Sequence, residues 1–297
     1  MASRVWFITG ASKGFGRVWT EAALARGDKV AATARDPGTL ADLVAKYGDA
    51  IEALKLDVTD KAEVAATVAA AHDRFGRLDI VINNAGYGLF GAIEEGTPEE
   101  YRPMFETNVF GLARMTQLVL PGMRAARCGR IVNIGSMGGR LVFPVGGYYH
   151  ASKYAIEAIS DALRFEVAPF GIKVSLVEPG LIRTGFGAVA ARSLAETATP
   201  TGPYAALNTA TDRQIAESYA SRFLSADPDA VAAVIARAVT ASRPRIRYVV
   251  TPVAKFLVHT RRLLGARFFD AYLRGQFRGW PSAPSIAPDS GQKVRST

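Results

Sequence analysis

The sequence predicts a single α/β domain in which a parallel sheet of about seven strands carries helices on both faces, a doubly wound three-layer arrangement. Apolar runs of strand length alternate with segments of helical period, which is the pattern of βαβ units. A glycine-rich turn follows the first apolar run and opens the first helical segment, as expected where a parallel strand leads into a helix. The predicted strands lie at 5–9, 29–33, 51–56, 80–83, 129–134, 173–178 and 246–250.

The helical patterns between these strands lie at 16–25, 61–75, 99–127 and 149–168, and they would cover both faces of the sheet. The domain is expected to span 1–280, with a Pro/Ser-rich tail at 281–297 that is predicted to be disordered. Segment 185–225 interrupts the alternation with a Thr/Pro/Gly/Ala-rich stretch and a helical pattern at 212–224. An insertion after a strand end is a candidate substrate lid. The alternative is that segment 185–225 is a mobile surface excursion with no role in substrate binding.

Composition limits the class of protein. With 49% hydrophobic and 21% charged residues, the chain lies in the range of globular proteins. No stretch approaches the ~18 apolar residues of a spanning helix, and the first residues lack the pattern of a signal peptide. We therefore expect a cytoplasmic protein. Cys128 is the only cysteine, so no internal disulfide can form, and a buried, inert thiol is expected.

The net charge of +9 is concentrated near the C-terminus. Residues 243–297 hold 11 basic and 2 acidic residues, whereas the first 242 residues hold 25 of each. This balance argues against a nucleic-acid site spread over the main domain. The basic amphipathic segment 252–280 mixes large apolar residues with cations. Two roles fit it: packing over the domain or over a partner subunit, and reversible attachment to anionic membranes.

The glycine-rich turn reads Thr9-Gly10-Ala11-Ser12-Lys13-Gly14-Phe15-Gly16. Glycines let the chain turn sharply and let backbone N–H groups approach a pyrophosphate at a helix N-terminus. A Gly-rich turn alone is also compatible with an ordinary strand-to-helix connection. Because it follows the first strand of an α/β pattern, it predicts dinucleotide binding.

This turn and several later motifs resemble those of the short-chain dehydrogenase/reductase family, which implies a Rossmann-like fold. The resemblance runs in order over residues 4–190. It includes Asn83-Asn84-Ala85-Gly86 at the end of the fourth strand. It implies that Asp57 and Val58 lie by the adenine and that Pro179, Gly180 and Thr184 lie by the nicotinamide carboxamide. The cofactor-binding residues expected in this way are Gly10, Ser12, Lys13, Gly14, Phe15, Gly16, Arg35, Asp57, Val58, Asn84, Ala85, Gly86, Tyr149, Lys153, Pro179, Gly180 and Thr184.

The second strand predicts the choice of cofactor. Ala34 stands where an NAD enzyme would carry an acidic residue for the ribose 2′-hydroxyl. Arg35 follows at once, and Lys13 lies in the glycine turn, so two cations can converge on a 2′-phosphate. We therefore expect NADP(H) to be preferred over NAD(H). The alternative is that Arg35 and Lys13 are two solvated surface cations that do not bind the cofactor.

Tyr149 and Lys153 match the Y-x-x-x-K pair of the family, which implies a reacting centre here, and their i, i+4 spacing puts both on one helix face. A neighbouring ammonium favours phenolate, so Lys153 is expected to lower the pKa of Tyr149 and make it a general acid or base. Ser136 precedes Tyr149 by 13 residues, the spacing of the family's serine, and would polarise the substrate oxygen. The resemblance implies that Asn108 kinks a helix and holds a water in the proton relay.

Within the family the chain resembles the branch of hydroxysteroid and retinol dehydrogenases, through Gly86-Tyr87-Gly88 and Glu178-Pro179-Gly180. This resemblance implies hydride transfer to or from an apolar carbonyl or secondary alcohol, and a homodimer or homotetramer. Leu141, Phe143 and Phe186 could line an apolar pocket or belong to a core or subunit contact. A redox-inactive NADPH-binding sensor or scaffold is the alternative function. No metal is expected, because the three histidines lack the spacing of metal ligands.

Overall fold

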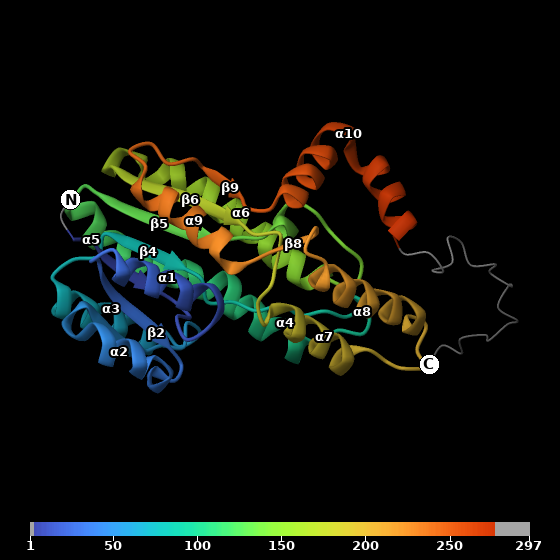
Figure 1. Cartoon of the computed structure of the whole chain (residues 1–297), viewed down its shortest axis with the longest axis horizontal. Helices are drawn as coiled ribbons and strands as arrows, with labels where there is room; N and C mark the ends of the chain where they lie inside the picture. Colours follow the sequence, from blue (N-terminus) through green and yellow to red (C-terminus); the bar gives the residue numbers. More distant parts are fainter. Residues whose placement is uncertain (1–2, 277–297) are drawn as a thin grey trace, which may run out of the picture.

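A computed structural model describes residues 3–276. Its centre is a seven-stranded parallel sheet in the order β3-β2-β1-β4-β5-β6-β9 (Figure 1). The chain builds outward from β1 to β3 and then returns to place β4 on the other side of β1. The strand order therefore reverses between β1 and β4, which is where α/β sheets bind ligands. The strands are β1 Val5–Ile8, β2 Lys29–Ala34, β3 Ile51–Lys55, β4 Ile80–Asn83, β5 Gly129–Ile134, β6 Ile172–Glu178 and β9 Arg247–Val249.

Helices cover both faces of this sheet. Trp6 and Ile8 of β1 pack into one hydrophobic cluster with α1, α2 and α9, while Val5 and Phe7 pack into another with α3, α5 and α6. Alternate side chains of a strand point to opposite faces, so β1 is buried from both sides. The helices are α1 Gly14–Ala25, α2 Ala41–Tyr47, α3 Lys61–Phe75, α4 Pro98–Phe105, α5 Leu112–Ala125, α6 Gly147–Val167, α7 Phe186–Thr197, α8 Ala205–Ala220, α9 Pro228–Thr240 and α10 Pro252–Gln276.

The doubly wound fold is confirmed, and the differences from expectation are local. The helix expected at 99–127 is three pieces, because a π-helical segment, Glu106–Gly111, separates α4 from α5. The helix expected at 212–224 begins earlier, at Ala205, directly after Pro203 and Tyr204. Helices α2 and α9 were not predicted. The tail at 281–297, and the last residues of segment 252–280, lie outside the described residues.

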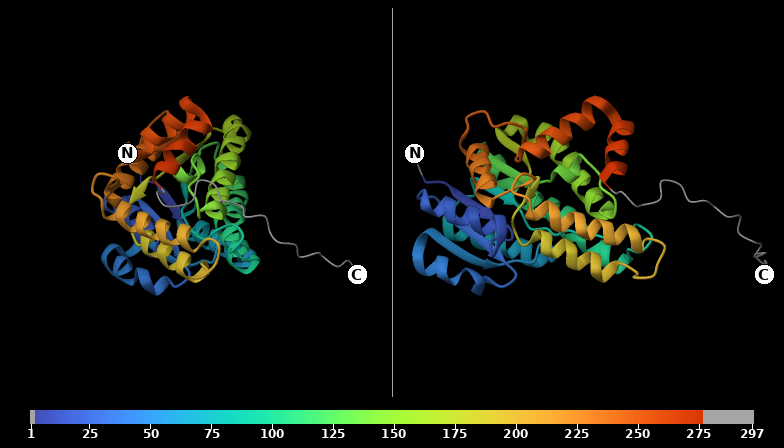
Figure 2. Two further views of the ribbon diagram at one scale, coloured as in Figure 1. Left: turned by 90° about the vertical axis from the view of Figure 1, so that its right-hand side faces the viewer. Right: turned by 45° about the vertical axis from the view of Figure 1, so that its right-hand side comes forward.

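Two excursions leave the sheet. Helices α7 and α8 extend beyond the carboxyl ends of the strands, and α10 stands out above them (Figure 2). A short parallel pair, β7 Leu181–Ile182 with β8 Ser225–Ala226, closes the base of the α7–α8 excursion. Among residues 3–276, no helix combines the length and the apolar composition that crossing a bilayer requires.

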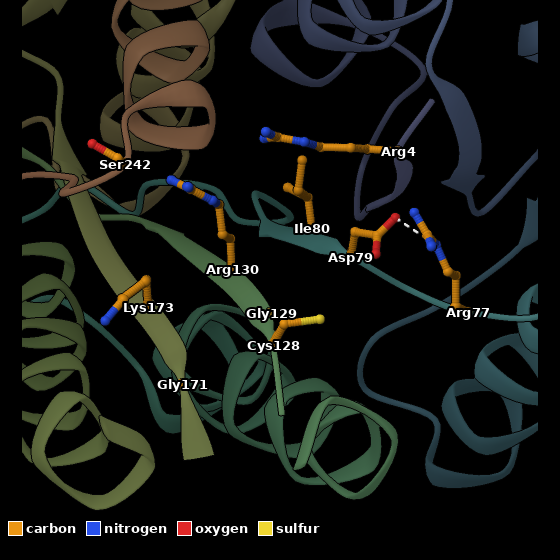
Figure 3. A pocket seen from close by; sticks show the side chains of 10 residues that line it. All are labelled: Arg4, Arg77, Asp79, Ile80, Cys128, Gly129, Arg130, Gly171, Lys173 and Ser242. Atoms are coloured by element: carbon orange, nitrogen blue, oxygen red, sulfur yellow. Dashed lines mark hydrogen bonds and ion pairs between the residues drawn. The ribbon is translucent and has the colours of Figure 1, made fainter. Parts of the chain in front are cut away.

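Cys128 is exposed, contrary to the expectation of a buried thiol, because it lies in the turn between α5 and β5. It lines a cavity of about 410 Å³ at the amino ends of the strands (Figure 3). The Arg130 guanidinium there donates to Ala238 O at 2.9 Å and to Ala241 O at 2.7 Å. These bonds satisfy carbonyls at the end of α9, which gives this cation of the cavity a structural role. The cavity lies at the opposite end of the sheet from the glycine turn.

Candidate active site

The glycine turn lies at the carboxyl end of β1 and leads into α1. Gly10 has φ +69°, and a Cβ on Gly16 would lie 2.1 Å from Gly10 O. Only glycine fits either position without strain. Lys13, the N-cap of α1, makes no side-chain capping bond, so no side-chain cap occupies the first N–H groups of this helix. A pyrophosphate fits this N-terminus, where the backbone donors and the helix dipole favour an anion.

The segment after β4 is bonded to this turn. Thr9 Oγ1 accepts hydrogen bonds from the backbone N–H groups of Asn84 and Ala85, both at 2.9 Å. In return, Asn84 Nδ2 donates to Thr9 O at 2.8 Å and to Gly10 O at 3.0 Å. These reciprocal bonds hold the ends of β1 and β4 in register on either side of the point where the strand order reverses.

The end of β2 carries the features that predict cofactor choice. Ala34 is buried, whereas Arg35 and Lys13 are exposed. Burial alone would raise the pKa of the Asp57 carboxyl, but hydrogen bonds from Thr59 and the nearby charge of Arg35 together lower it. The guanidinium therefore lies close to the expected adenine position at the end of β3. The two cations remain accessible to a phosphate at this edge of the sheet.

The structure brings Ser136, Tyr149 and Lys153 together. Ser136 lies two residues after β5, and its Oγ accepts from Gly138 N at 3.0 Å. Tyr149 and Lys153 lie one turn apart on α6 and are both buried. Lys153 Nζ donates to Ile134 O at 2.9 Å and lies 5.8 Å from the centre of the Tyr149 ring. The β5 carbonyl thus fixes the ammonium beside the phenol.

The expected lowering of the Tyr149 pKa is not what the structure shows. Burial raises the pKa of Tyr149 to about 12, and only the contact with the Ser136 hydroxyl counteracts this. Burial also lowers the pKa of Lys153 to about 8, against the influence of Glu157. Desolvation is the largest influence on both groups, because a low-dielectric environment disfavours each charged form. At neutral pH the phenol is therefore protonated.

Asn108 lies in the π-helical segment between α4 and α5. Its Nδ2 donates to Tyr87 O at 2.9 Å and to Ser152 Oγ at 3.1 Å, and its Oδ1 accepts from Tyr87 N at 3.0 Å. The side chain thus ties α6 to the segment that follows β4. These contacts position the helix of Tyr149 and Lys153, while the water-holding role implied by the resemblance stays a prediction.

His150 was considered in the sequence only as a metal ligand, yet it contributes to the site. Its Nδ1 lies 3.0 Å from Gly138 O, and its Nε2 accepts from Phe143 N at 3.2 Å. These partners assign the proton to Nδ1, and burial lowers the pKa of the imidazole to about 4. A neutral His150 therefore fixes the loop that begins at Ser136. In the sequence, the only indication of this role is that His150 directly follows Tyr149.

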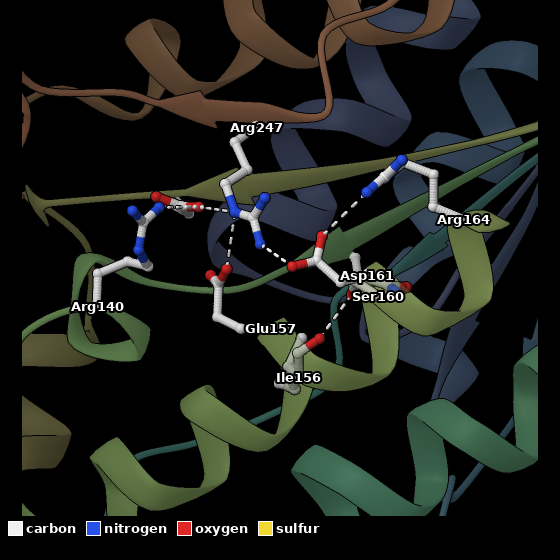
Figure 4. Close-up of polar contacts among 9 residues, drawn as sticks. Arg140, Ile156, Glu157, Ser160, Asp161, Arg164 and Arg247 are labelled. Atoms are coloured by element: carbon white, nitrogen blue, oxygen red, sulfur yellow. Dashed lines mark hydrogen bonds and ion pairs between the residues drawn. The ribbon is translucent and has the colours of Figure 1, made fainter.

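A buried ionic network lies behind the site, between α6, β6 and β9 (Figure 4). Arg247 Nε lies 3.0 Å from Glu157 Oε2 and 3.3 Å from Glu178 Oε1, and Arg140 Nη1 lies 3.5 Å from the same Glu178 oxygen. Burial raises the pKa of Glu157 to about 7 and also raises that of Glu178. Glu157 follows Lys153 by one turn, so this network anchors α6 to the sheet beside the reacting centre.

The predicted nicotinamide segment connects the sheet to the α7–α8 excursion. Pro179 O accepts from Met137 N at 2.9 Å, which joins it to the loop after Ser136. A Cβ on Gly180 would lie 2.2 Å from Thr251 Oγ1. Thr184 Oγ1 accepts from Phe186 N at 3.2 Å, at the start of α7. The three residues therefore lie along one edge of the site.

Aromatic side chains from the α7–α8 excursion and from the segment after β4 cover Tyr149. The Phe186 ring lies 5.5 Å and the Phe90 ring 5.7 Å from the Tyr149 ring, centre to centre. Tyr219 of α8 packs over Gly187 of α7, and burial raises the pKa of the Tyr219 phenol. Sequence reasoning missed Tyr219, because a long chain separation hides its proximity.

Acidic side chains hold the excursion over the site. Glu95 Oε1 accepts from Thr199 N at 3.0 Å, and its Oε2 accepts from Asn208 Nδ2 at 2.8 Å. Tyr204 OH donates to Glu94 Oε2 at 2.6 Å. These polar and partly exposed bonds attach α7 and α8 at their far end, whereas β7 and β8 attach them at the base. Among residues 3–276, no group of three or more His, Cys, Asp or Glu could hold a metal.

Comparison with known proteins gives concordant matches. A family model described as short chain dehydrogenase matches residues 4–194. Oxidoreductase BOA17 of Botryotinia fuckeliana is 37% identical over 253 residues, which are 85% of this chain and 90% of that protein. The 3-ketodihydrosphingosine reductase of Bacteroides thetaiotaomicron is 43% identical over 186 residues, 63% of this chain and 66% of that protein.

Solved structures agree with these matches. A short-chain dehydrogenase from Streptomyces avermitilis has a TM-score of 0.78 and 40% identity, covering 94% of this chain and 98% of its own. A Burkholderia phymatum short-chain dehydrogenase/reductase in complex with NAD has a TM-score of 0.75 and 27% identity, over 88% and 93% of the two chains. A serine dehydrogenase complexed with NADP+ has a TM-score of 0.73 and 28% identity, over 84% and 95%.

Proposed function

Because this chain belongs to the short-chain dehydrogenase/reductase family, we propose that it transfers a hydride between NADP(H) and an apolar ketone or secondary alcohol. An NAD(P)-dependent oxidoreductase follows from the family, and solved relatives hold NAD or NADP. The observation that carries the finer proposal is the burial of the Tyr149 phenol near Ser136, with the rings of Phe90 and Phe186 packed against it.

In the direction of reduction, Tyr149 donates its proton to the substrate oxygen, while the Ser136 hydroxyl hydrogen-bonds to the same oxygen and polarises the carbonyl. The bound nicotinamide supplies the hydride. The phenol carries its proton at neutral pH, as proton donation in this direction requires. Lys153, fixed by Ile134 O, contacts the cofactor ribose hydroxyls, as the resemblance implies.

The surroundings of Tyr149 support an apolar substrate. Phe90 and Phe186 contact its ring, and Leu89 and Met104 belong to the same cluster. Such a lining favours hydrocarbon next to the reacting carbonyl, with few polar groups to orient it. The likeness to a protein named 3-ketodihydrosphingosine reductase points the same way. Steroid-, retinoid- and lipid-like ketones are therefore the substrates proposed.

Exposed apolar side chains on the helices support an oligomeric state. Exposed apolar side chains lie at Phe110, before α5, at Leu118 on α5 and at Phe165 on α6. A homodimer or homotetramer that buries these residues is therefore proposed. The cytoplasmic location stays a prediction from the sequence.

A spectrophotometric screen tests the proposed function. We expect the purified protein to oxidise NADPH in the presence of long-chain or polycyclic ketones, and to do so faster than with short polar ketones, because the site is lined with aromatic groups. Absorbance of the reduced nicotinamide is the measurement. Tight NADPH binding without turnover of any ketone, aldehyde or alcohol would instead favour the redox-inactive sensor.

We also propose that residues 185–225 form a substrate lid held by Glu95. The Glu95→Ala variant loses the bonds to Thr199 N and Asn208 Nδ2. At about 1 kcal/mol per bond, amide exchange across α7 and α8 should quicken by roughly tenfold or more. Hydrogen-exchange mass spectrometry measures this effect. In the wild-type protein, binding of NADPH together with a ketone should slow amide hydrogen exchange in α7 and α8 more than in the strands of the sheet.

The control for the lid is Glu99→Ala, which removes an exposed carboxylate of α4. Its exchange across α7 and α8 should match wild type. Equal exchange in both variants, or no protection by ligand, would show that the excursion is a surface feature without a gating role.

A further inference from the structure

Helix α10 packs on the domain with only one of its sides. Leu257, Val258 and Phe269 are buried against Leu141, and the Phe269 ring lies 6.0 Å from that of Phe143 in an edge-on arrangement. Packing over the domain, one of the two roles expected for the basic segment, is therefore present. Leu141 belongs to this cluster and not to the surroundings of Tyr149.

The other side of α10 exposes large apolar side chains. Leu263 is 78% exposed, Phe256 67%, Leu264 55% and Phe268 50%. The helix bends at Gly265, whose φ of +76° is non-helical, so these residues lie on two short helical pieces. Several large apolar groups grouped on one projecting element mark an interaction surface.

Cations surround this apolar surface. Helix α10 carries five cations and a single acidic residue, Asp270. The cations are Lys255, Arg261, Arg262, Arg267 and Arg274. Within residues 3–276, the ion pairs found do not include any of these five cations, although arginines elsewhere, such as Arg17 and Arg247, pair with carboxylates. A partner that carries negative charge would therefore complement this helix.

We propose that α10 docks on the surface of an anionic lipid bilayer, with its apolar side chains among the acyl chains and its cations at the headgroups. Apolar groups interleaved with Lys and Arg on one helix are what such a surface binds. A second copy of this chain fits less well. A two-fold contact would bring the same cations together across the interface.

Docking through α10 would place the bilayer beside the reacting centre. Phe143 contacts Phe269 of α10 on one side and His150, the neighbour of Tyr149, on the other. An apolar substrate dissolved in the bilayer would then lie close to the site. This consequence depends on the proposed reaction, whereas the docking itself does not.

Sedimentation with vesicles tests the proposal. The full-length protein should bind phosphatidylcholine vesicles that contain phosphatidylserine, bind them less at high salt, and bind phosphatidylcholine alone much more weakly. Each cation near an anionic surface contributes about fivefold in affinity. The triple variant Arg262→Gln, Arg267→Gln, Arg274→Gln should therefore bind roughly a hundredfold more weakly.

The matched control replaces three exposed arginines on other helices, Arg102→Gln, Arg124→Gln and Arg237→Gln, and has the same net charge. It should bind like wild type if α10 is the docking site. The variant Leu263→Ser, Leu264→Ser should also bind more weakly, with its melting temperature unchanged because both side chains are exposed.

Three results would overturn the proposal. The first is no vesicle binding by wild type at low salt. The second is equal loss in the two arginine triple variants, which would show a general charge effect. The third is a smaller oligomer for Leu263→Ser, Leu264→Ser with vesicle binding unchanged, which would assign this face to contact between copies. Because vesicle binding is measured without substrate, none of these results depends on the proposed reaction.

Discussion

Tyr149→Phe is expected to lower ketone reduction by about a hundredfold to ten thousandfold, the contribution typical of a positioned general acid. The ring remains, and so do its contacts with Phe90 and Phe186. Only the hydroxyl beside Ser136 is lost. Cofactor affinity should therefore change little, so that turnover and binding separate. Single-turnover kinetics and NADPH fluorescence titration measure the two effects.

Tyr148→Phe is the matched control. The Tyr148 hydroxyl donates to Ile93 O at 3.1 Å, and its ring stacks on Tyr101 at 4.5 Å, away from Ser136. This variant loses the same atom from the adjacent residue and should keep near wild-type turnover. If instead Tyr149→Phe reduces ketones as fast as wild type, Tyr149 is not the acid.

We expect the enzyme to prefer NADPH over NADH by about tenfold to a thousandfold in kcat/KM. Charge-assisted hydrogen bonds from Arg35 and Lys13 to the 2′-phosphate contribute about 1.5 to 3 kcal/mol each. Both cations are exposed at this edge of the sheet, which reduces their contribution through solvent screening. The protein also offers the ribose 2′-hydroxyl of NADH no carboxylate at position 34, because Ala34 stands there. The nearby Asp36 already accepts a hydrogen bond from Gly38 N through its Oδ1, at 2.9 Å.

Replacing Ala34 with Asp and Arg35 with Gln should reverse this preference, because the new carboxylate accepts the ribose hydroxyls of NADH and repels a phosphate. Initial rates at equal cofactor concentrations measure the change. Lys173→Gln, at the opposite end of the sheet, removes a cation without altering the preference. Equal use of NADH and NADPH by wild type would refute this interpretation of β2, while family membership would stand.

Much of the site was predictable because its residues follow strand ends. Gly10, Ser136 and Pro179 each lie one or two residues after a strand of the parallel sheet, and the carboxyl ends of such strands meet at one edge. Tyr149 and Lys153 match the family's pair on one helix face. Contacts between distant segments were not predictable in this way. Tyr219 of α8 packs over Gly187 of α7, and Asn108 bonds to Tyr87 and Ser152. No local sequence pattern indicates these contacts.

The sequence by itself determined the doubly wound sheet and the place of the glycine turn, because periodicity and turn chemistry act over a few residues. The Ser-Tyr-Lys set followed from the resemblance to the family. Tertiary structure alone decided the electrostatics and the exposure. The sequence places an ammonium one turn from Tyr149 and predicts a lowered pKa, whereas burial among side chains of α4, α7 and the segment after β4 raises the pKa of the phenol. Cys128 is exposed and α10 is buried on one side only. Desolvation depends on every segment packed around a group, and those segments come from all parts of the chain.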